Sequence, residues 1–223
     1  MRFVRDNSLS IFFLAIFLAS LAGQAIAGHG AFNHDQLLHH GDAISLGRYL
    51  TTSEFAADVA ENWQSEYLQF TLYIVGTVWL LQRGSPESKP LDQAGRESDE
   101  DQKVGAHADA RSPRWARTGG LRTTLYGNSL LIVMTTIWLG SWLAQSIAGA
   151  SGYNADQLDH QAATVSWLDY LGSSDFWSRT LQNWQSEFLA VGSMAILSVY
   201  LRQRGSPESK PVGAPHDATG VEG

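Results

Sequence analysis

The sequence predicts an all-α membrane protein with four transmembrane helices, built from two tandem, parallel two-helix repeats and with both termini in the cytoplasm (N-in/C-in). Three observations lead to this prediction: an internal repeat over most of the chain, apolar runs of membrane-spanning length, and a one-sided distribution of Lys and Arg. Each repeat would leave the cytoplasm and return to it. The two copies would therefore share one orientation, related by a pseudo-two-fold axis along the membrane normal.

The repeat appears at a constant offset of 121 residues, which aligns Asn7–Pro90 with Asn128–Pro211 and leaves 38 of 84 positions identical. The clearest identical blocks are Asn-Trp-Gln-Ser-Glu at 62–66 and 183–187, and Gln-Arg-Gly-Ser-Pro-Glu-Ser-Lys-Pro at 82–90 and 203–211. Agreement over a whole unit indicates a duplication, and each unit should fold alike. The predicted domains are repeat unit 1 (1–90), a disordered cytoplasmic linker (91–120), repeat unit 2 (121–211) and a disordered tail (212–223).

Apolar runs and helix-end signals predict four spans, at about 9–28, 54–83, 125–148 and 175–204. The second helix of each copy should begin at a capping Ser53 or Ser174 and end before Gly84 or Gly205. The first run could instead be a cleaved signal peptide, since it follows basic residues and ends in Ala-Ile-Ala. The repeat argues against cleavage, because the equivalent internal run ends in the same way.

The sidedness follows from the basic residues. Of the 15 Lys and Arg residues, only Arg48 and Arg179 lie in the two loops that join the helices of a pair. The others lie in the N-terminus, the linker or the tail, and basic residues beside a span resist translocation. The joining loops are therefore predicted to lie outside the cell membrane, where their many Asp and Glu residues would place most of the negative charge.

Composition excludes several functions. The chain has no Cys, so thiolate nucleophiles, Cys-ligated metals and disulfides are excluded. The net charge of −7 argues against nucleic-acid binding, which needs clustered Lys and Arg. No Gly-rich phosphate loop, His-Glu-x-x-His motif or nucleophile elbow is found, and no cofactor is expected.

The duplicated Asn-Trp-Gln-Ser-Glu block is the best candidate for a site. Trp63 and Trp184 suit anchors at the outer membrane interface. The predicted polar binding site combines residues of both copies: Asn62, Glu66, Asn183, Glu187, Gln24 and Gln145. If the pseudo-two-fold axis turns both copies inward, the two glutamates would approach and disfavour each other's ionisation, as in a site for a cation or proton. Alternatively, each glutamate snorkels to the headgroups or accepts hydrogen bonds from the neighbouring glutamine.

A weaker pattern concerns metals. Asp35 and His39, and equally Asp156 and His160, lie four residues apart, a spacing that could supply two ligands to one metal on a helix. Two ligands do not complete a site, and such Asp residues often cap a loop helix instead.

Two further segments carry predictions. Helical spacing predicts a short interfacial helix around Tyr49 and its counterpart Tyr170. The duplicated Gly-Ser-Pro-Glu-Ser-Lys-Pro block contains helix-stopping Gly and Pro, but its identical Ser, Glu and Lys exceed what a helix stop requires. Docking to a cytoplasmic partner is one explanation.

The blocks Asn183–Ala190 and Leu201–Val212 resemble a family of bacterial multi-pass membrane proteins known only as a domain of unknown function. The resemblance covers nearly the whole chain and both copies of each block. It implies a location in the bacterial cytoplasmic membrane. It implies no activity, substrate or catalytic residue.

Three functional hypotheses follow. The first is a non-enzymatic membrane module with an outward-facing polar binding site. The second, a small transporter or a proton- or cation-coupled channel, would need polar positions through the full membrane depth. The third, a membrane-embedded metal-dependent hydrolase, has only the doubled Asp, His and Glu in its favour. The expected partners are the lipid bilayer, a second copy of the chain, or an unidentified membrane or cytoplasmic protein.

Overall fold

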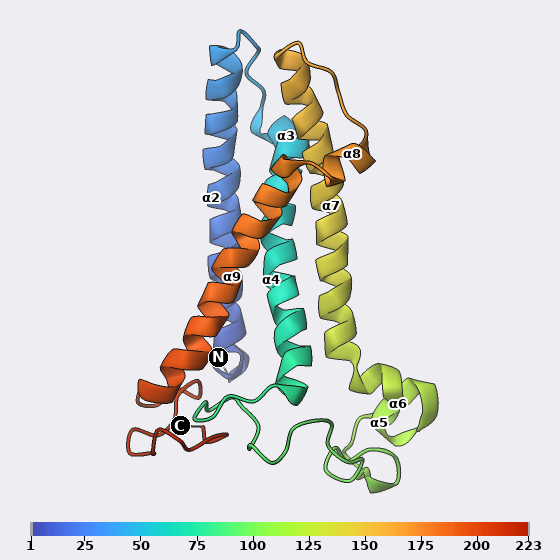
Figure 1. Cartoon of the computed structure of the whole chain (residues 1–223), viewed down its shortest axis with the longest axis vertical. Coiled ribbons are helices and arrows are strands. Elements are labelled where there is room, and N and C mark those ends of the chain that lie inside the picture. Colours follow the sequence, from blue (N-terminus) through green and yellow to red (C-terminus); the bar gives the residue numbers. More distant parts are fainter. Residues whose placement is uncertain (1, 223) are drawn as a thin grey trace. The chain divides into compact units, whose positions relative to one another are not determined.

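The computed structural model describes residues 2–222, and every regular element within them is helical, which confirms the all-α part of the prediction (Figure 1). The elements in order are α1 (Arg2–Asp6), α2 (Ser8–Leu38), α3 (Leu46–Tyr49), α4 (Ser53–Trp79), the 3-10 turn η1 (Gly105–His107), α5 (Arg114–Arg117), α6 (Gly120–Gly127), α7 (Ser129–Asp159), α8 (Trp167–Leu171) and α9 (Ser174–Tyr200).

The long helices occur as two pairs of equal length. Helices α2 and α7 have 31 residues each, and α4 and α9 have 27 residues each. Of these, α2 and α7 are long and apolar enough to cross a membrane. At about 1.5 Å per residue, 31 residues span roughly 45 Å, which exceeds the ~30 Å of a hydrocarbon core. Helices α4 and α9 carry more charge in their first halves.

The helix ends differ from the predicted ones in detail. Helices α4 and α9 begin one residue after their caps, which are Thr52 and Ser173 rather than Ser53 and Ser174. Their hydroxyls accept hydrogen bonds from the backbone N–H groups of Phe55 (3.3 Å) and Phe176 (3.2 Å). Both helices also end four residues earlier than predicted, because the chain turns to form the bonded loops described below. In contrast, α2 and α7 extend about ten residues beyond the apolar runs.

Helices α3 and α8 confirm the two short helices predicted around Tyr49 and Tyr170. Between residues 91 and 119 the chain forms only η1 and α5 within its irregular path, so the disordered linker stays a prediction. The chain divides into two compact units that do not follow the repeat boundaries. Unit 1 comprises Met1–Val59 and Ala144–Trp167, and unit 2 comprises Ala60–Leu143 and Leu168–Gly223.

Unit 1 is organised by buried Tyr49 and by an asparagine in each copy. The Tyr49 ring lies 5.9 Å from that of His29, 5.6 Å from that of Phe32 and 5.4 Å from that of Phe55. A Cβ atom on Gly28 would lie 2.3 Å from the Tyr49 hydroxyl, so this glycine permits the close approach.

The asparagine of each copy holds the returning loop. Asn33 donates to the carbonyl of Ile44 (2.9 Å) and accepts from its N–H (2.8 Å). Asn154 makes the same pair of bonds with Val165, at 2.9 and 2.8 Å. A single amide side chain thereby satisfies both backbone groups of a residue eleven positions later, which explains its presence in both copies.

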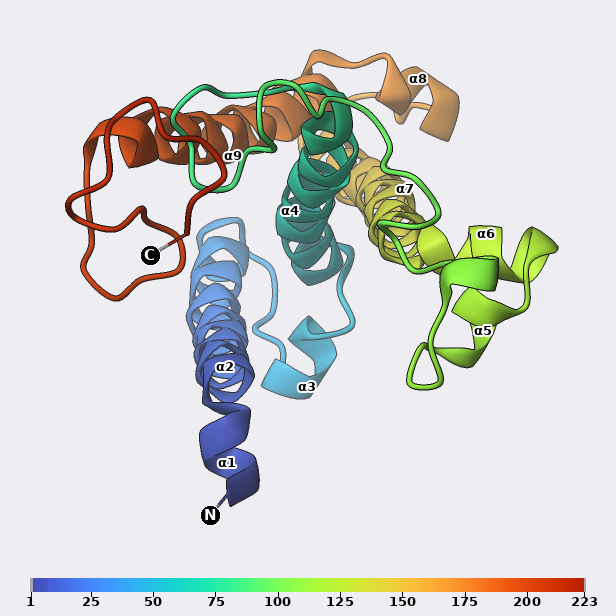
Figure 2. The same cartoon turned by 90° about the horizontal axis from the view of Figure 1, so that it is seen from below.

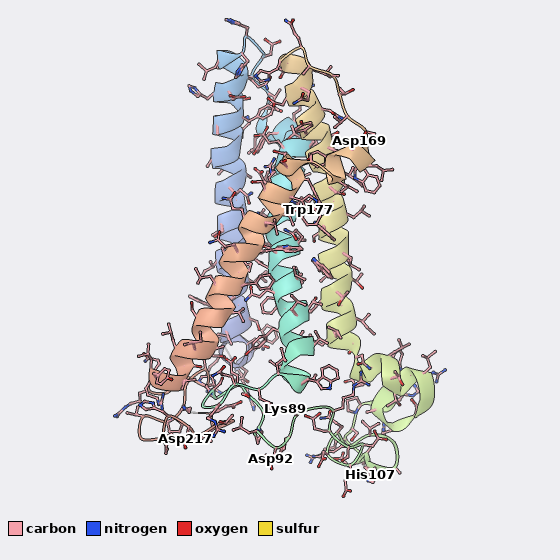
Figure 3. All side chains as sticks on the ribbon, viewed as in Figure 1. Lys89, Asp92, His107, Asp169, Trp177 and Asp217 are labelled. Carbon is pink, nitrogen blue, oxygen red and sulfur yellow. The ribbon has the colours of Figure 1, made fainter. Side chains whose placement is uncertain are left out.

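Unit 2 contains most of α4, the first half of α7, and α9. Helix α9 crosses α4 obliquely, and the two helices diverge toward their C-terminal ends (Figures 1 and 2). Trp142 of α7 is the centre of an aromatic cluster. Its ring lies 6.0–6.1 Å from those of Trp138, Phe176, Trp177 and Trp184. Stacked and edge-on rings of this kind fix α7 against the first half of α9; Figure 3 labels Trp177 there.

Candidate functional site

The two Asn-Trp-Gln-Ser-Glu blocks lie on α4 and α9, within unit 2, and they are joined directly. The indole N–H of Trp184 donates to the side-chain oxygen of Gln64 at 2.8 Å. Gln64 is fully buried, and among the described residues its amide nitrogen Nε2 has no hydrogen-bond partner. A buried donor without an acceptor is costly, by about 1–3 kcal/mol, so this nitrogen is a position at which a ligand oxygen would be favourable.

An ion pair lies next to this bond. Nε of Arg179 contacts Oε1 of Glu61 at 2.7 Å, with the glutamate side chain 11% exposed and the arginine side chain 42% exposed. The pair occurs once, because the repeat equivalent of Arg179 is Asp58 and that of Glu61 is Gln182. In the sequence, Glu61 and Arg179 are recognisable only as charged residues of the joining loops. The reversed charge between Asp58 and Arg179 was the one signal that could have suggested a contact between the copies.

The predicted glutamates are brought together. Glu187 lies close enough to Glu66 for the two carboxylates to interact electrostatically, as expected if the copies face each other. Asn183 uses its amide within its own helix, donating to the carbonyl of Arg179 at 3.0 Å. Asn62 is exposed on the same stretch of α4. These four residues and Gln64 define what we call the outer polar site.

Two other predicted site residues, Gln24 and Gln145, belong to unit 1, where Gln24 is half-buried and Gln145 is buried. Trp63 is 38% exposed and suits the predicted interface anchor. Trp184 differs, because its N–H is bonded to Gln64 within the protein.

The Asp–His pairs make local contacts at the ends of α2 and α7. Nδ1 of His39 lies 3.0 Å from the carbonyl oxygen of Asp35, and Nδ1 of His160 lies 2.8 Å from that of Asp156. The carbonyl contact, with the nearby carboxylates, raises the pKa of His160. Within residues 2–222, no group of three or more His, Asp or Glu residues is arranged to hold a metal. Each pair lies at a helix end, where its imidazole contacts a carbonyl of the last helical turn.

The duplicated Gln-Arg-Gly-Ser-Pro-Glu-Ser-Lys-Pro block folds into the same turn twice. Ser88 Oγ accepts from the N–H of Gln82 (3.0 Å), and Ser209 Oγ accepts from that of Gln203 (2.9 Å). The glycines have φ values of +84° and +80°, in the left-handed region that favours glycine. Internal bonds thus account for the identical Gly and Ser residues.

The lysine of each turn binds the chain that follows it. Lys89 Nζ donates to the carbonyl of Gly95 at 2.7 Å and pairs with Glu97, which lowers the pKa of that carboxyl. Lys210 is 1% exposed and donates to three backbone carbonyls, those of Pro215 (3.2 Å), His216 (2.8 Å) and Ala218 (3.2 Å). An ammonium group has three donors, and all are used. Its burial lowers the pKa of Lys210; Figure 3 labels Lys89 and, within the tail, Asp217.

The glutamate of each turn faces the other turn. Glu87 accepts a hydrogen bond from the hydroxyl of Tyr73, and its carboxyl group lies close to that of Glu208. This proximity to Glu87 is the main reason that the pKa of Glu208 is raised.

Two cavities, of about 370 and 330 Å³, adjoin this pair where α4 and α9 diverge. Both are lined by Gln69, Tyr73, Glu87, Val191 and Ala195. The sequence does not predict these two cavities, because a cavity between helices depends on their crossing angle. The arrangement as a whole is suited to recognition through hydrogen bonds and charge.

These features define an all-helical protein with two helices able to cross a membrane and with a polar layer between α4 and α9. The chain belongs to the family described as Domain of unknown function (DUF6766), whose model matches residues 1–221. Neither the curated proteins nor the solved structures contain a significant match to the chain.

Proposed function

We propose that this protein is a four-span membrane module of two parallel repeats, with both termini in the cytoplasm, and that it binds a small polar ligand at the outer polar site. Helices α4 and α9 would be the second and fourth spans. Their 27 residues reach about 40 Å, enough to cross with the first turns in water. The exposed apolar side chains of α2 between residues 11 and 18 support contact with lipid.

The observation that carries the binding proposal is the buried, unpartnered amide nitrogen of Gln64. Glu66, two residues further along α4 and within electrostatic range of Glu187, supplies negative charge to the same block. A ligand with one acceptor and one cationic or N–H donor group could accept from the Gln64 amide nitrogen and donate to the glutamate carboxylates. The bond from Trp184 to Gln64 orients the amide, because its oxygen is already used. Binding of such a ligand at the outer polar site requires no covalent chemistry.

A single-cysteine scan tests the topology and the site together. The natural chain contains no Cys, so the background with a membrane-impermeant thiol reagent is zero. In intact cells, D35C and D159C should react and S98C should not. Labelling of S98C from outside would overturn the proposed sidedness. E66C and E187C should also react, because a ligand-binding mouth is open to water, and silence at both would overturn the site.

A transport function is a second candidate, favoured by one observation. Below Asn62 and Glu66, the polar residues Gln69, Tyr73 and Thr77 continue at intervals of three or four along α4, and these three line the larger cavity. This polar stripe leads from the outer polar site toward Glu87. Polar positions through the membrane depth are what a conducting path requires.

A further inference from the structure

The cavities beside the two turns have the size and lining of a ligand site. Their volumes of about 370 and 330 Å³ fall within the range of small-molecule pockets. All lining residues belong to unit 2. On the α9 side the wall is apolar or small, formed by Phe188, Ala190, Val191, Met194 and Ala195. On the α4 side the larger cavity adds Leu72, Gly76 and Leu80.

The C-terminal end of these cavities is acidic. Glu87 lines both cavities and Glu208 lines the second, and the two carboxyl groups lie close together. Other groups acting on the pair are the Tyr73 hydroxyl from α4 and the Glu222 carboxylate from the tail, neither of which supplies positive charge.

Three basic side chains near the two turns are engaged elsewhere. Lys89 is bonded to Gly95 and Glu97, and Lys210 to three tail carbonyls. Arg202 donates to the carbonyls of Val199 (3.1 Å) and Ala214 (3.1 Å). Among the described residues that line the two cavities, none is Lys or Arg. The negative charge at the acidic end is therefore open to a cation supplied from outside the chain.

The walls of the cavities also contain aromatic side chains. These are Phe70 and Tyr73 from α4 and Phe188 from α9. Aromatic faces attract organic cations, and the effect is larger where water is excluded. A small inorganic cation would gain little from apolar walls, whereas a bulky organic cation gains from the walls and from the carboxylates alike.

We propose that these cavities bind a hydrophobic organic monocation, with its charge held at the acidic end by Glu87 and Glu208. The site uses none of the residues of the outer polar site. It is independent of the ligand proposed there, so the two can fail separately.

The test uses tetraphenylphosphonium as the probe and tetraphenylborate as a control of similar shape and opposite charge. Binding to the full-length protein in lipid nanodiscs is measured by equilibrium dialysis, with empty nanodiscs subtracted. Tetraphenylphosphonium should bind saturably. Equal saturable binding of tetraphenylborate would overturn the proposal.

Two variants separate charge from shape. The double variant E87Q/E208Q keeps the side-chain size and removes the charge, so tetraphenylphosphonium should bind about tenfold more weakly or worse. Ala195→Trp fills the cavity from α9 and leaves both turns intact, so it should also abolish binding. The matched control is Glu100→Gln, in the exposed linker, which should bind like the natural chain. Unchanged binding to both test variants would refute the site, and E66Q/E187Q should leave it intact.

Discussion

His160 lies just beyond the end of α7, where the last carbonyls of a helix present partial negative charge. Its ring contacts the Asp156 carbonyl at 2.8 Å and the Asp156 carboxylate at 3.4 Å. Both contacts favour the protonated imidazolium, and the carbonyl contributes more to the raised pKa. In the first copy, His39 makes the same two contacts with Asp35, at 3.0 Å to the carbonyl and 3.6 Å to the carboxylate.

The pKa of His160 should therefore lie above 6.5 in the folded protein, as measured by NMR of the imidazole proton. Since the folded pKa is raised, this contact stabilises the end of α7 fully below about pH 6.5, and the stabilisation is lost as pH rises through the folded pKa. Asp156→Asn should lower the pKa only partly, because the backbone carbonyl stays. A pKa at or below 6.5 in the natural chain would contradict the contact.

At the scale of elements, the contacts that join α4 and α9 include the Glu61–Arg179 ion pair and the Trp184–Gln64 hydrogen bond. Glu61 is nearly buried, whereas Arg179 is partly exposed. The arginine therefore loses little hydration, and the pair contributes on the order of 1 kcal/mol. Leaving the glutamate buried without its arginine should cost more than removing both charges.

A double-mutant cycle checks this contact. Arg179→Met should lower the midpoint of thermal unfolding in detergent more than E61Q/R179M does, with a coupling of about 1 kcal/mol. Arg111→Met, in the linker, serves as the control and should leave the midpoint unchanged. Additive effects of the two single substitutions would mean that Glu61 and Arg179 do not interact in solution.

The elements also show what could be read from the sequence. The apolar runs and the helix-stopping Gly residues predicted the long helices, and helical spacing predicted α3 and α8. The helix ends were missed, because Ser88 and Lys89 act through bonds to backbone atoms several residues away. The contacts of Gln64 and Glu61 were missed because each joins residues about 120 positions apart, and local patterns do not specify such pairings.

At the scale of the whole molecule, the compact units and the repeats do not coincide. Each unit contains residues from both copies, so neither copy completes a unit by itself. The bonds between Trp184 and Gln64 and between Arg179 and Glu61 join the copies within unit 2. The copies should therefore depend on each other for stability, even though each carries its own pair of long helices.

Cleavage in the linker tests this dependence. A protease site inserted after Asp99 should be cut without separating the halves, which should co-purify in mild detergent through the contacts between α4 and α9. The same cut in the R179M/W184F variant should release the halves more readily, as measured by affinity capture of one half. Immediate separation of the halves from the natural sequence would show that the copies are independent.

The turn after α4 has a further consequence for how the chain is made. The N–H of Gly84 is bonded to the hydroxyl of Thr219 at 2.8 Å, and the carbonyl of Ser85 accepts from the N–H of Gly220 at 3.0 Å. A side chain at Gly84 would collide with the carbonyl of His216. The ribosome adds Thr219 135 residues after Gly84, when α7 and α9 have already been synthesised. The first turn is thus completed only after the whole second copy has been translated, so its final structure depends on residues at the far end of the chain.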